Sequence, residues 1–71
     1  MPDVNAFLAA CAPGDAITIT DANGISFAAI VVAVGSGGFP LELQEAGANS
    51  NTFWTPQGNE TAFAIAGKGT F

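Results

Sequence analysis

The sequence has 71 residues and a formal net charge of −5, with one lysine, one cysteine and no histidine, arginine or tyrosine. Catalysis near neutral pH uses chiefly His, Cys, Lys and paired carboxylates, so this composition predicts a protein that is not an enzyme and needs no metal or other cofactor. It also excludes the basic patch with which a single subunit would bind a nucleic-acid backbone.

Residues 2–12 are predicted to form a short helix, begun by Pro2-Asp3 and ended by Pro13-Gly14. Its apolar residues fall at i, i+3, i+4 and i+7, which makes one stripe of Val4, Phe7, Leu8 and Cys11. Because Cys11 lies on this stripe, we expect its side chain to be buried as a small apolar group and not to act as a reactive thiol.

Residues 15–20 alternate as a half-buried strand does, with Ile17 and Ile19 facing the core. Asp21-Ala22-Asn23-Gly24 is a tight turn, because Asn-Gly tolerates positive φ. The first two strands should therefore pair antiparallel.

The second strand, residues 25–34, contains a change of phase. Ile25 and Phe27 share one face, and Ile30, Val32 and Val34 share the other. A strand that switches its buried face at Ala28-Ala29 would be bent or bulged, as at a barrel corner. The alternative is a strand buried on both faces, one of them against a partner.

Residues 35–38 form a glycine-rich loop, and no Lys or helix follows that would make it a phosphate-binding loop. The third strand is predicted over 39–45, with Phe39, Leu41 and Leu43 inward. Pro40 must then lie near the start of the strand or on an edge.

Two more strands are predicted, over 52–55 and 61–66, separated by a turn at 56–59. On the last strand Phe63 and Ile65 share one face, and the alanines on the other face allow a second surface to approach closely. Residues 67–71 are expected to be a flexible tail.

Small size favours self-association. A domain below roughly 70–80 residues gains only a few kcal/mol from its core and needs a further constraint, and one cysteine cannot supply a disulfide. Apolar residues make up 49% of the chain and charged residues 10%, so some apolar surface must face outward, which is typical of interfaces.

The longest apolar run, 27–34, is far shorter than the ~20 residues of a membrane helix. The first residues lack the basic region of a signal peptide. These features predict a soluble, intracellular protein located in the cytoplasm, which would be the host cytoplasm for a phage-encoded protein.

A short helix followed by five strands, the second long and bent, resembles the Sm/LSm family, and in particular the small Sm-like proteins of marine cyanophage type. The resemblance covers 1–71 as one domain and implies a mainly β fold, in which a short N-terminal helix precedes a five-stranded, strongly bent antiparallel open barrel. An SH3-like or OB-like barrel would give a similar pattern of elements.

Two motifs of the family can be matched to this sequence. The first, Asp-x-x-hydrophobic-Asn, falls best on 36–40, where Ser36, Gly38 and Pro40 stand at its Asp, base-stacking and base-reading positions. The second, Arg-Gly-Asp/Asn, falls on Gln57-Gly58-Asn59, with Gln57 in place of the Arg. The resemblance therefore implies a ring of five to seven subunits, closed by strand four of one subunit on strand five of the next, more than it implies uridine recognition.

The first functional hypothesis is a homo-oligomeric ring that binds single-stranded nucleic acid, RNA more than DNA, through stacking and hydrogen bonding. Its candidate residues are Phe39 and Trp54 for stacking, Gln57 and Asn59 for base edges, and Lys68 for a phosphate. Each has another interpretation, because Phe39 fits the core, Trp54 fits a subunit interface, and Lys68 fits a solvated tail.

The second hypothesis is a non-catalytic structural or assembly module without nucleic-acid binding, such as a phage accessory ring protein. It accounts for the low charge, for the second strand with two apolar faces and for the missing uridine pocket. Binding of a small ligand between subunits is a variant of it.

Overall fold

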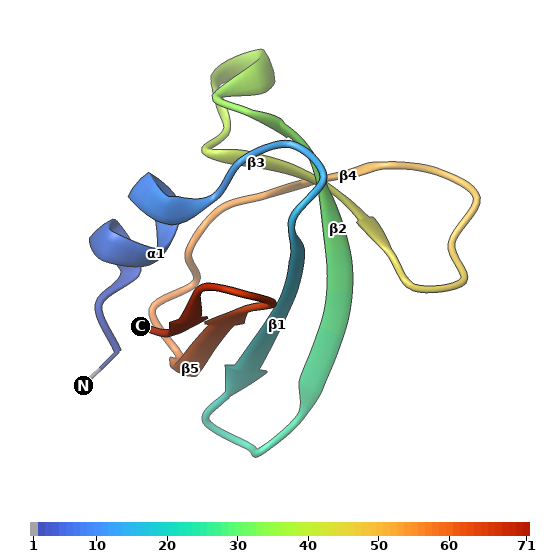
Figure 1. Cartoon of the computed structure of the whole chain (residues 1–71). Helices are drawn as coiled ribbons and strands as arrows, with labels where there is room; N and C mark the ends of the chain where they lie inside the picture. The colour runs from blue at the N-terminus through green and yellow to red at the C-terminus, as the bar shows by residue number, and fades with distance from the viewer. Residues whose placement is uncertain (1) are drawn as a thin grey trace.

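The computed structural model describes residues 2–71, with the backbone alone for Ser36. One helix precedes six strands and a single 3₁₀ turn, in the order α1 Val4–Ala10, β1 Ala16–Asp21, β2 Ser26–Val34, η1 Ser36–Gly38, β3 Leu41–Glu45, β4 Thr52–Trp54, β5 Glu60–Ile65 and β6 Gly69–Thr70. The strands form one antiparallel sheet in the order β4-β3-β2-β1-β5-β6. The sheet is strongly bent and does not close, and α1 lies on the inner side of the bend (Figure 1).

The predicted fold class, a short helix followed by a bent open β-barrel, is confirmed. The expected flexible tail is wrong, because residues 67–71 turn back and add β6 to β5. Lys68 N donates to Ile65 O at 2.9 Å, and Phe71 N donates to Phe63 O at 2.9 Å. Gly67 and Gly69 take positive φ of 81° and 95°, so these glycines make a tight turn.

The helix has the predicted start and the predicted buried stripe. The Asp3 side chain caps it by accepting a hydrogen bond from Ala6 N at 3.0 Å. Phe7 and Cys11 are buried, and Val4 and Leu8 pack against the core from its margin. The helix ends at Ala10, earlier than predicted, because Cys11 has extended backbone angles.

The hairpin between β1 and β2 forms in the predicted place. One Asp21 carboxylate oxygen accepts hydrogen bonds from Asn23 N at 2.8 Å and Ile25 N at 3.1 Å, which is a local side-chain turn. Only Gly24 takes positive φ, at 78°. The aspartate therefore fixes the turn, and Asn23 keeps an ordinary backbone conformation.

The predicted phase change at Ala28-Ala29 is wrong. Ala29 and Val31 are buried and Phe27 is partly buried, whereas the alternate residues Ile30, Val32 and Val34 are 44%, 37% and 47% exposed. The irregularity lies at 31–33, in the pairing with β3. An alanine at a buried position hides the true period. β2 has one buried face and one exposed apolar face, and the alternative, that the second face is buried against a partner, stays a prediction.

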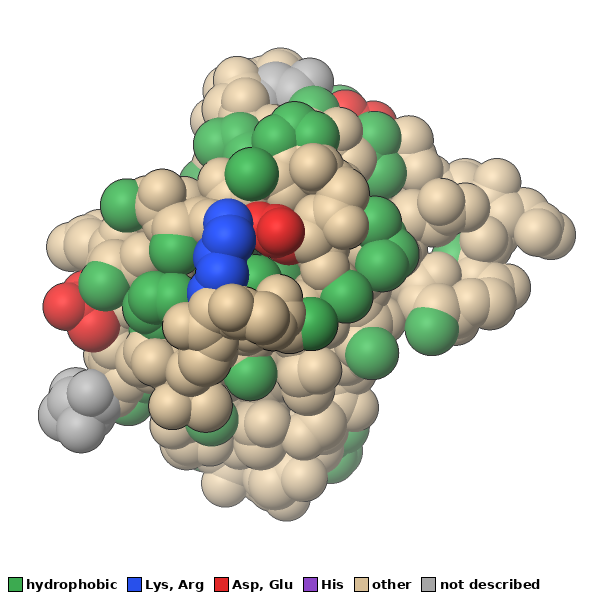
Figure 2. Space-filling view, in the orientation of Figure 1, with side chains coloured by type: hydrophobic (Ala, Val, Ile, Leu, Met, Phe, Trp, Pro, Cys, Tyr) green, Lys and Arg blue, Asp and Glu red, His purple; other side chains and the backbone are tan. Residues whose placement is uncertain are grey.

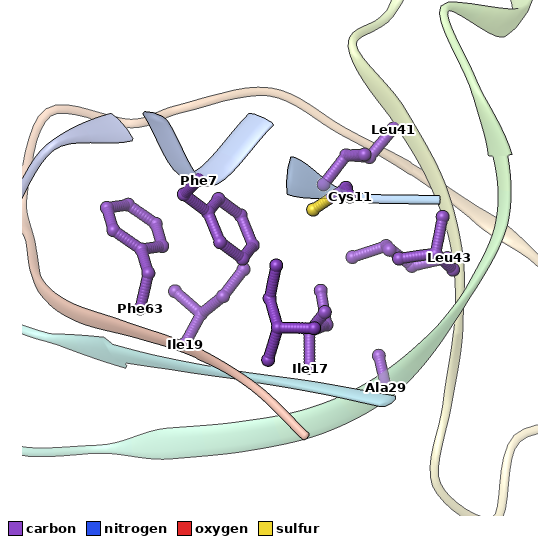
Figure 3. Packing of buried hydrophobic residues seen from close by; sticks show 10 residues of the cluster. Phe7, Cys11, Ile17, Ile19, Ala29, Leu41, Leu43 and Phe63 are labelled. Carbon is purple, nitrogen blue, oxygen red and sulfur yellow. The ribbon is translucent and has the colours of Figure 1, made fainter. Parts of the chain in front are cut away.

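Phe7 lies at the centre of the core. Its ring stacks on Phe63 at a centroid distance of 4.5 Å, and its edge contacts are with Trp54 at 6.4 Å and Phe71 at 6.3 Å. Figure 3 shows Phe7 beside Phe63 and Ile19, in one cluster with the inward residues of β1, β2, β3 and β5. In residues 2–71 the buried apolar side chains are Phe7, Cys11, Ile17, Ile19, Ala29, Val31, Leu41, Leu43, Phe63 and Ile65.

Phe39 is not part of this core, contrary to the predicted inward position. β3 begins at Leu41, so Phe39 lies before Pro40, outside the strand alternation, and its side chain is 40% exposed. Leu41 and Leu43 are buried as predicted.

Replacing Phe7 by alanine should lower the free energy of unfolding by about 3–5 kcal/mol, because it leaves a cavity that the strands around it cannot fill. Phe53→Ala removes the same side chain from a position that is 48% exposed and should cost about 1 kcal/mol or less. Urea denaturation followed by circular dichroism measures both values. Equal losses would show that Phe7 does not organise the core.

Candidate nucleic-acid interface

Three of the five candidate residues for nucleic-acid binding come together at one pocket. Trp54, Gln57 and Asn59 line a cavity of about 170 Å³ between the β1–β2 hairpin and the segment that joins β4 to β5. The other lining residues are Ile19, Asp21, Ile25, Phe27 and Glu60. We call this cavity the hairpin pocket.

Glu60 holds the segment that carries the two amides. Its carboxylate oxygens accept hydrogen bonds from Gln57 N at 2.7 Å and Gly58 N at 3.2 Å. The Gln57 side-chain amide donates to Thr55 O at 2.8 Å. The donor of Gln57 is therefore engaged within its own turn, whereas Asn59 is exposed to solvent at the pocket.

Trp54 has one side in the core and another at the pocket. Its ring makes edge contacts with Phe7 at 6.4 Å and Phe63 at 6.3 Å, and it also lines the hairpin pocket. The side chain is only partly buried. Trp54 thus forms a wall of the pocket that cannot rotate away without disturbing the core.

The charge at the hairpin pocket is negative. Asp21 and Glu60 contribute carboxylates, and no lysine or arginine is among the lining residues in the part of the chain that the structure describes. Like charges repel, so this pocket disfavours phosphate and suits a neutral or positively charged group.

Lys68, the predicted phosphate contact, lies elsewhere and is already paired. Its amine donates to Asp15 Oδ2 at 2.8 Å and to Ala10 O at 2.6 Å. Figure 2 shows the lysine beside this carboxylate. Residues 15 and 21 stand at opposite ends of β1, about 20 Å apart at the usual rise of a strand. Lys68 is therefore neither part of the pocket nor the solvated tail charge that was the other prediction.

The Lys68 ammonium bonds directly to Asp15 and holds the pKa of that carboxyl below its usual value, assisted by the backbone N–H of Ala12. A lowered folded-state pKa adds stability above the ordinary Asp pKa, and this stability is lost as the pH falls through the folded pKa. Between pH 5 and pH 3 (about the range of carboxylate titration), the wild type should therefore lose more unfolding free energy than Asp15→Asn. Urea titrations at each pH measure the difference, and parallel curves would contradict the role given to this pair.

Phe39 lies at a third place, where it makes an exposed aromatic pair with Phe53. The rings stack at a centroid distance of 5.3 Å and an angle of 26°, and the side chains are 40% and 48% exposed. A Cβ atom on Gly37 would lie 3.3 Å from the Phe53 ring, so the η1 turn packs against the pair. The sequence pattern did not single out Phe53, although neighbouring residues on a strand point to opposite faces, so that a core-facing Trp54 places Phe53 outward.

Cys11 is a free, buried cysteine. Burial raises the pKa of its thiol to about 11, and nearby Asp15 adds to the shift. Within residues 2–71 no three Cys, His, Asp or Glu side chains come together as metal ligands would.

Native protein at pH 8 should alkylate with iodoacetamide far more slowly than protein unfolded in urea, because the reactive thiolate is scarce at a pKa of about 11 and the sulfur is shielded. Mass spectrometry of quenched samples follows the reaction. Equal rates in the two states would show that Cys11 is accessible.

None of the helices in residues 2–71 combines the length and the apolar character required to cross a bilayer. Comparison with protein-family models, with curated proteins and with solved structures gives no significant match.

Proposed function

We propose that this chain is a non-catalytic module that works by assembling with copies of itself, as an Sm-like ring in which neighbouring subunits join their sheets edge to edge. The observation that carries the proposal is the open sheet, whose two ends both present strand edges that no other strand of residues 2–71 covers. An unpaired edge offers N–H and C=O groups that another strand can bind.

The two open edges match in length. At one end β4, Thr52–Trp54, pairs only with β3 within the described chain. At the other end β6 pairs with β5 at Ala64 and Ile65, and Phe71 N donates to Phe63 O. Residues 60–62 of β5 are left open on that side. Three residues of β4 on one subunit could thus pair with three residues of β5 on the next, as the Sm-like resemblance implies.

Exposed apolar side chains accompany the β4 edge. Phe53 lies on β4 itself, and Phe39 stacks on it. Burying this pair against a neighbouring subunit would remove apolar surface from water, which stabilises association at roughly 25 cal/mol per Å² before the costs of assembly.

Phe53→Lys should convert the assembly into monomers, because a lysine on an edge strand opposes pairing with another strand. Phe39→Lys removes the ring stacked on Phe53 and adds the same charge outside β4; it should weaken assembly less, because the edge strand itself is unchanged. Size-exclusion chromatography with multi-angle light scattering gives the mass of each variant.

If Phe53→Lys keeps the wild-type mass while its circular dichroism spectrum stays native, the β4 edge is not the contact. If both variants fall to monomers, the aromatic pair and not the strand edge holds the subunits together.

A second candidate function is binding of single-stranded nucleic acid, and the exposed Phe39–Phe53 pair favours it. Bases stack on such aromatic rings, and stacking is worth about 1–3 kcal/mol per base. The charges act against it, since Lys68 is engaged with Asp15 and the hairpin pocket is acidic. Any such binding would depend on stacking and would change little with salt.

Phe39→Ala combined with Phe53→Ala should weaken binding of a fluorescent oligonucleotide at least about tenfold, as expected for the loss of one stacked base. Gln57→Ala with Asn59→Ala should have the same effect if the hairpin pocket reads base edges. Fluorescence anisotropy with RNA and DNA of mixed sequence measures both. Wild-type protein that binds neither oligonucleotide would exclude this function.

A further inference from the structure

Two carboxylates of the hairpin pocket lie directly opposite each other in the sheet. Asp21 is the pairing partner of Glu60 at the end of the β1–β5 ladder, and both residues line the pocket. Like charges at opposite positions of neighbouring strands destabilise a sheet. The sequence has one lysine and no arginine or histidine, and that lysine, Lys68, is bonded to Asp15. No basic side chain of this chain is thus left to offset the two carboxylates.

A β-bulge brings these two carboxylates together. Regular pairing would have set Thr61 opposite Asp21, but the register shifts by one residue, so that Ala62 lies opposite Thr20 and Glu60 lies opposite Asp21. The Thr61 hydroxyl donates to Asp21 O at 3.0 Å, which holds the bulge against β1. Bulges of this kind re-aim side chains, and this one adds the carboxylate of Glu60 to the pocket.

The carboxylates are fixed in position and have little capacity for further hydrogen bonds. Backbone N–H groups already bind both oxygens of Glu60 and Oδ1 of Asp21, and among residues 2–71 only Asp21 Oδ2 of these four oxygens accepts none. A lysine-type ammonium is strongly hydrated and has three donors to satisfy, and Ca²⁺ takes six to eight oxygen ligands. The pocket therefore offers negative charge to a cation that needs few acceptors.

The other walls of the pocket are mostly apolar and aromatic. Ile19 and Ile25 supply aliphatic side chains, and Phe27 and Trp54 supply rings. Aromatic rings attract cations, tryptophan most strongly, and such surfaces recognise quaternary ammonium groups. The ring contact of Trp54 with Phe7, at 6.4 Å, holds this wall in place before any ligand binds, which lowers the cost of binding.

We propose that the hairpin pocket binds a trimethylammonium group, carried by a small organic cation or by a trimethylated lysine of another protein. This group has a positive charge but no N–H donor, so that it matches carboxylates whose oxygens are already engaged and walls that are apolar. The volume of about 170 Å³ limits the occupant to a small head group. All the lining residues belong to one chain, so the proposal does not depend on the edge pairing of subunits.

The fluorescence of Trp54 reports on the pocket directly, because it is the only tryptophan of the sequence. Choline should change the emission in a saturable way, with half-saturation in the millimolar range or below. The uncharged alcohol in which a tert-butyl group replaces the trimethylammonium group of choline has the same shape, and it should bind at least about tenfold more weakly. Potassium chloride at equal ionic strength controls for salt.

Asp21→Asn and Glu60→Gln each remove one charge and keep an oxygen that can accept the backbone hydrogen bonds. Each should weaken the binding of choline at least about tenfold. Glu45→Gln is the matched control, because it makes the same change of charge at an exposed residue of β3 outside the pocket, and it should leave the affinity unchanged. Circular dichroism checks the fold, and two separate charge variants keep the test valid if one of them unfolds.

A peptide with one trimethyllysine between neutral residues separates the two sources of the group. Tighter binding of this peptide than of choline would assign the group to a protein, and equal or weaker binding would assign it to a small molecule. The proposal is overturned if neither choline nor the peptide gives a saturable change. Equal binding of the uncharged alcohol, or wild-type affinity in both charge variants, overturns it as well.

Discussion

The insertion of Phe7 into the bent sheet is the contact on which the rest of the structure depends. An open barrel of this length has a core too small to close on itself, and α1 supplies the missing wall. Phe7 stacks on Phe63 of β5 and meets Trp54 of β4, so one helical side chain connects the two ends of the sheet. The Asp3 cap and the Lys68 bond to Ala10 O hold that helix at its two ends.

This arrangement uses the inner face of the sheet and leaves the outer face without a partner. The buried residues come from the inward positions of β1, β2, β3 and β5. The outward positions of β1 and β2 are also uncharged, whereas Asp21 and Glu60 stand at strand ends and Glu42 lies within β3. The two open edges of the same sheet are the basis of the edge pairing proposed above.

The regular alternation of large apolar residues with other residues made several strands and their buried faces predictable. Ile17 with Ile19 and Phe63 with Ile65 are buried as their period-two pattern requires. The buried face of β2 was predicted wrongly because Ala29, a small residue, occupies a buried position. Strand β6 was not predicted because Gly67 and Gly69 are also typical of a flexible tail. The partner of Lys68 lies 53 residues away, a distance over which no local pattern gives information. For the same reason the sequence suggested Trp54, Gln57 and Asn59 but could not reveal that Asp21 lines their pocket.

The most direct test is the mass of the wild-type chain in solution, measured by analytical ultracentrifugation from nanomolar to high micromolar concentration. If sheets of neighbouring subunits join edge to edge, the chain forms discrete, closed assemblies whose mass is a whole multiple of the subunit and which persist on dilution into the micromolar range. A monomer at every concentration would contradict edge pairing, because the open edges of the sheet would then remain in contact with water.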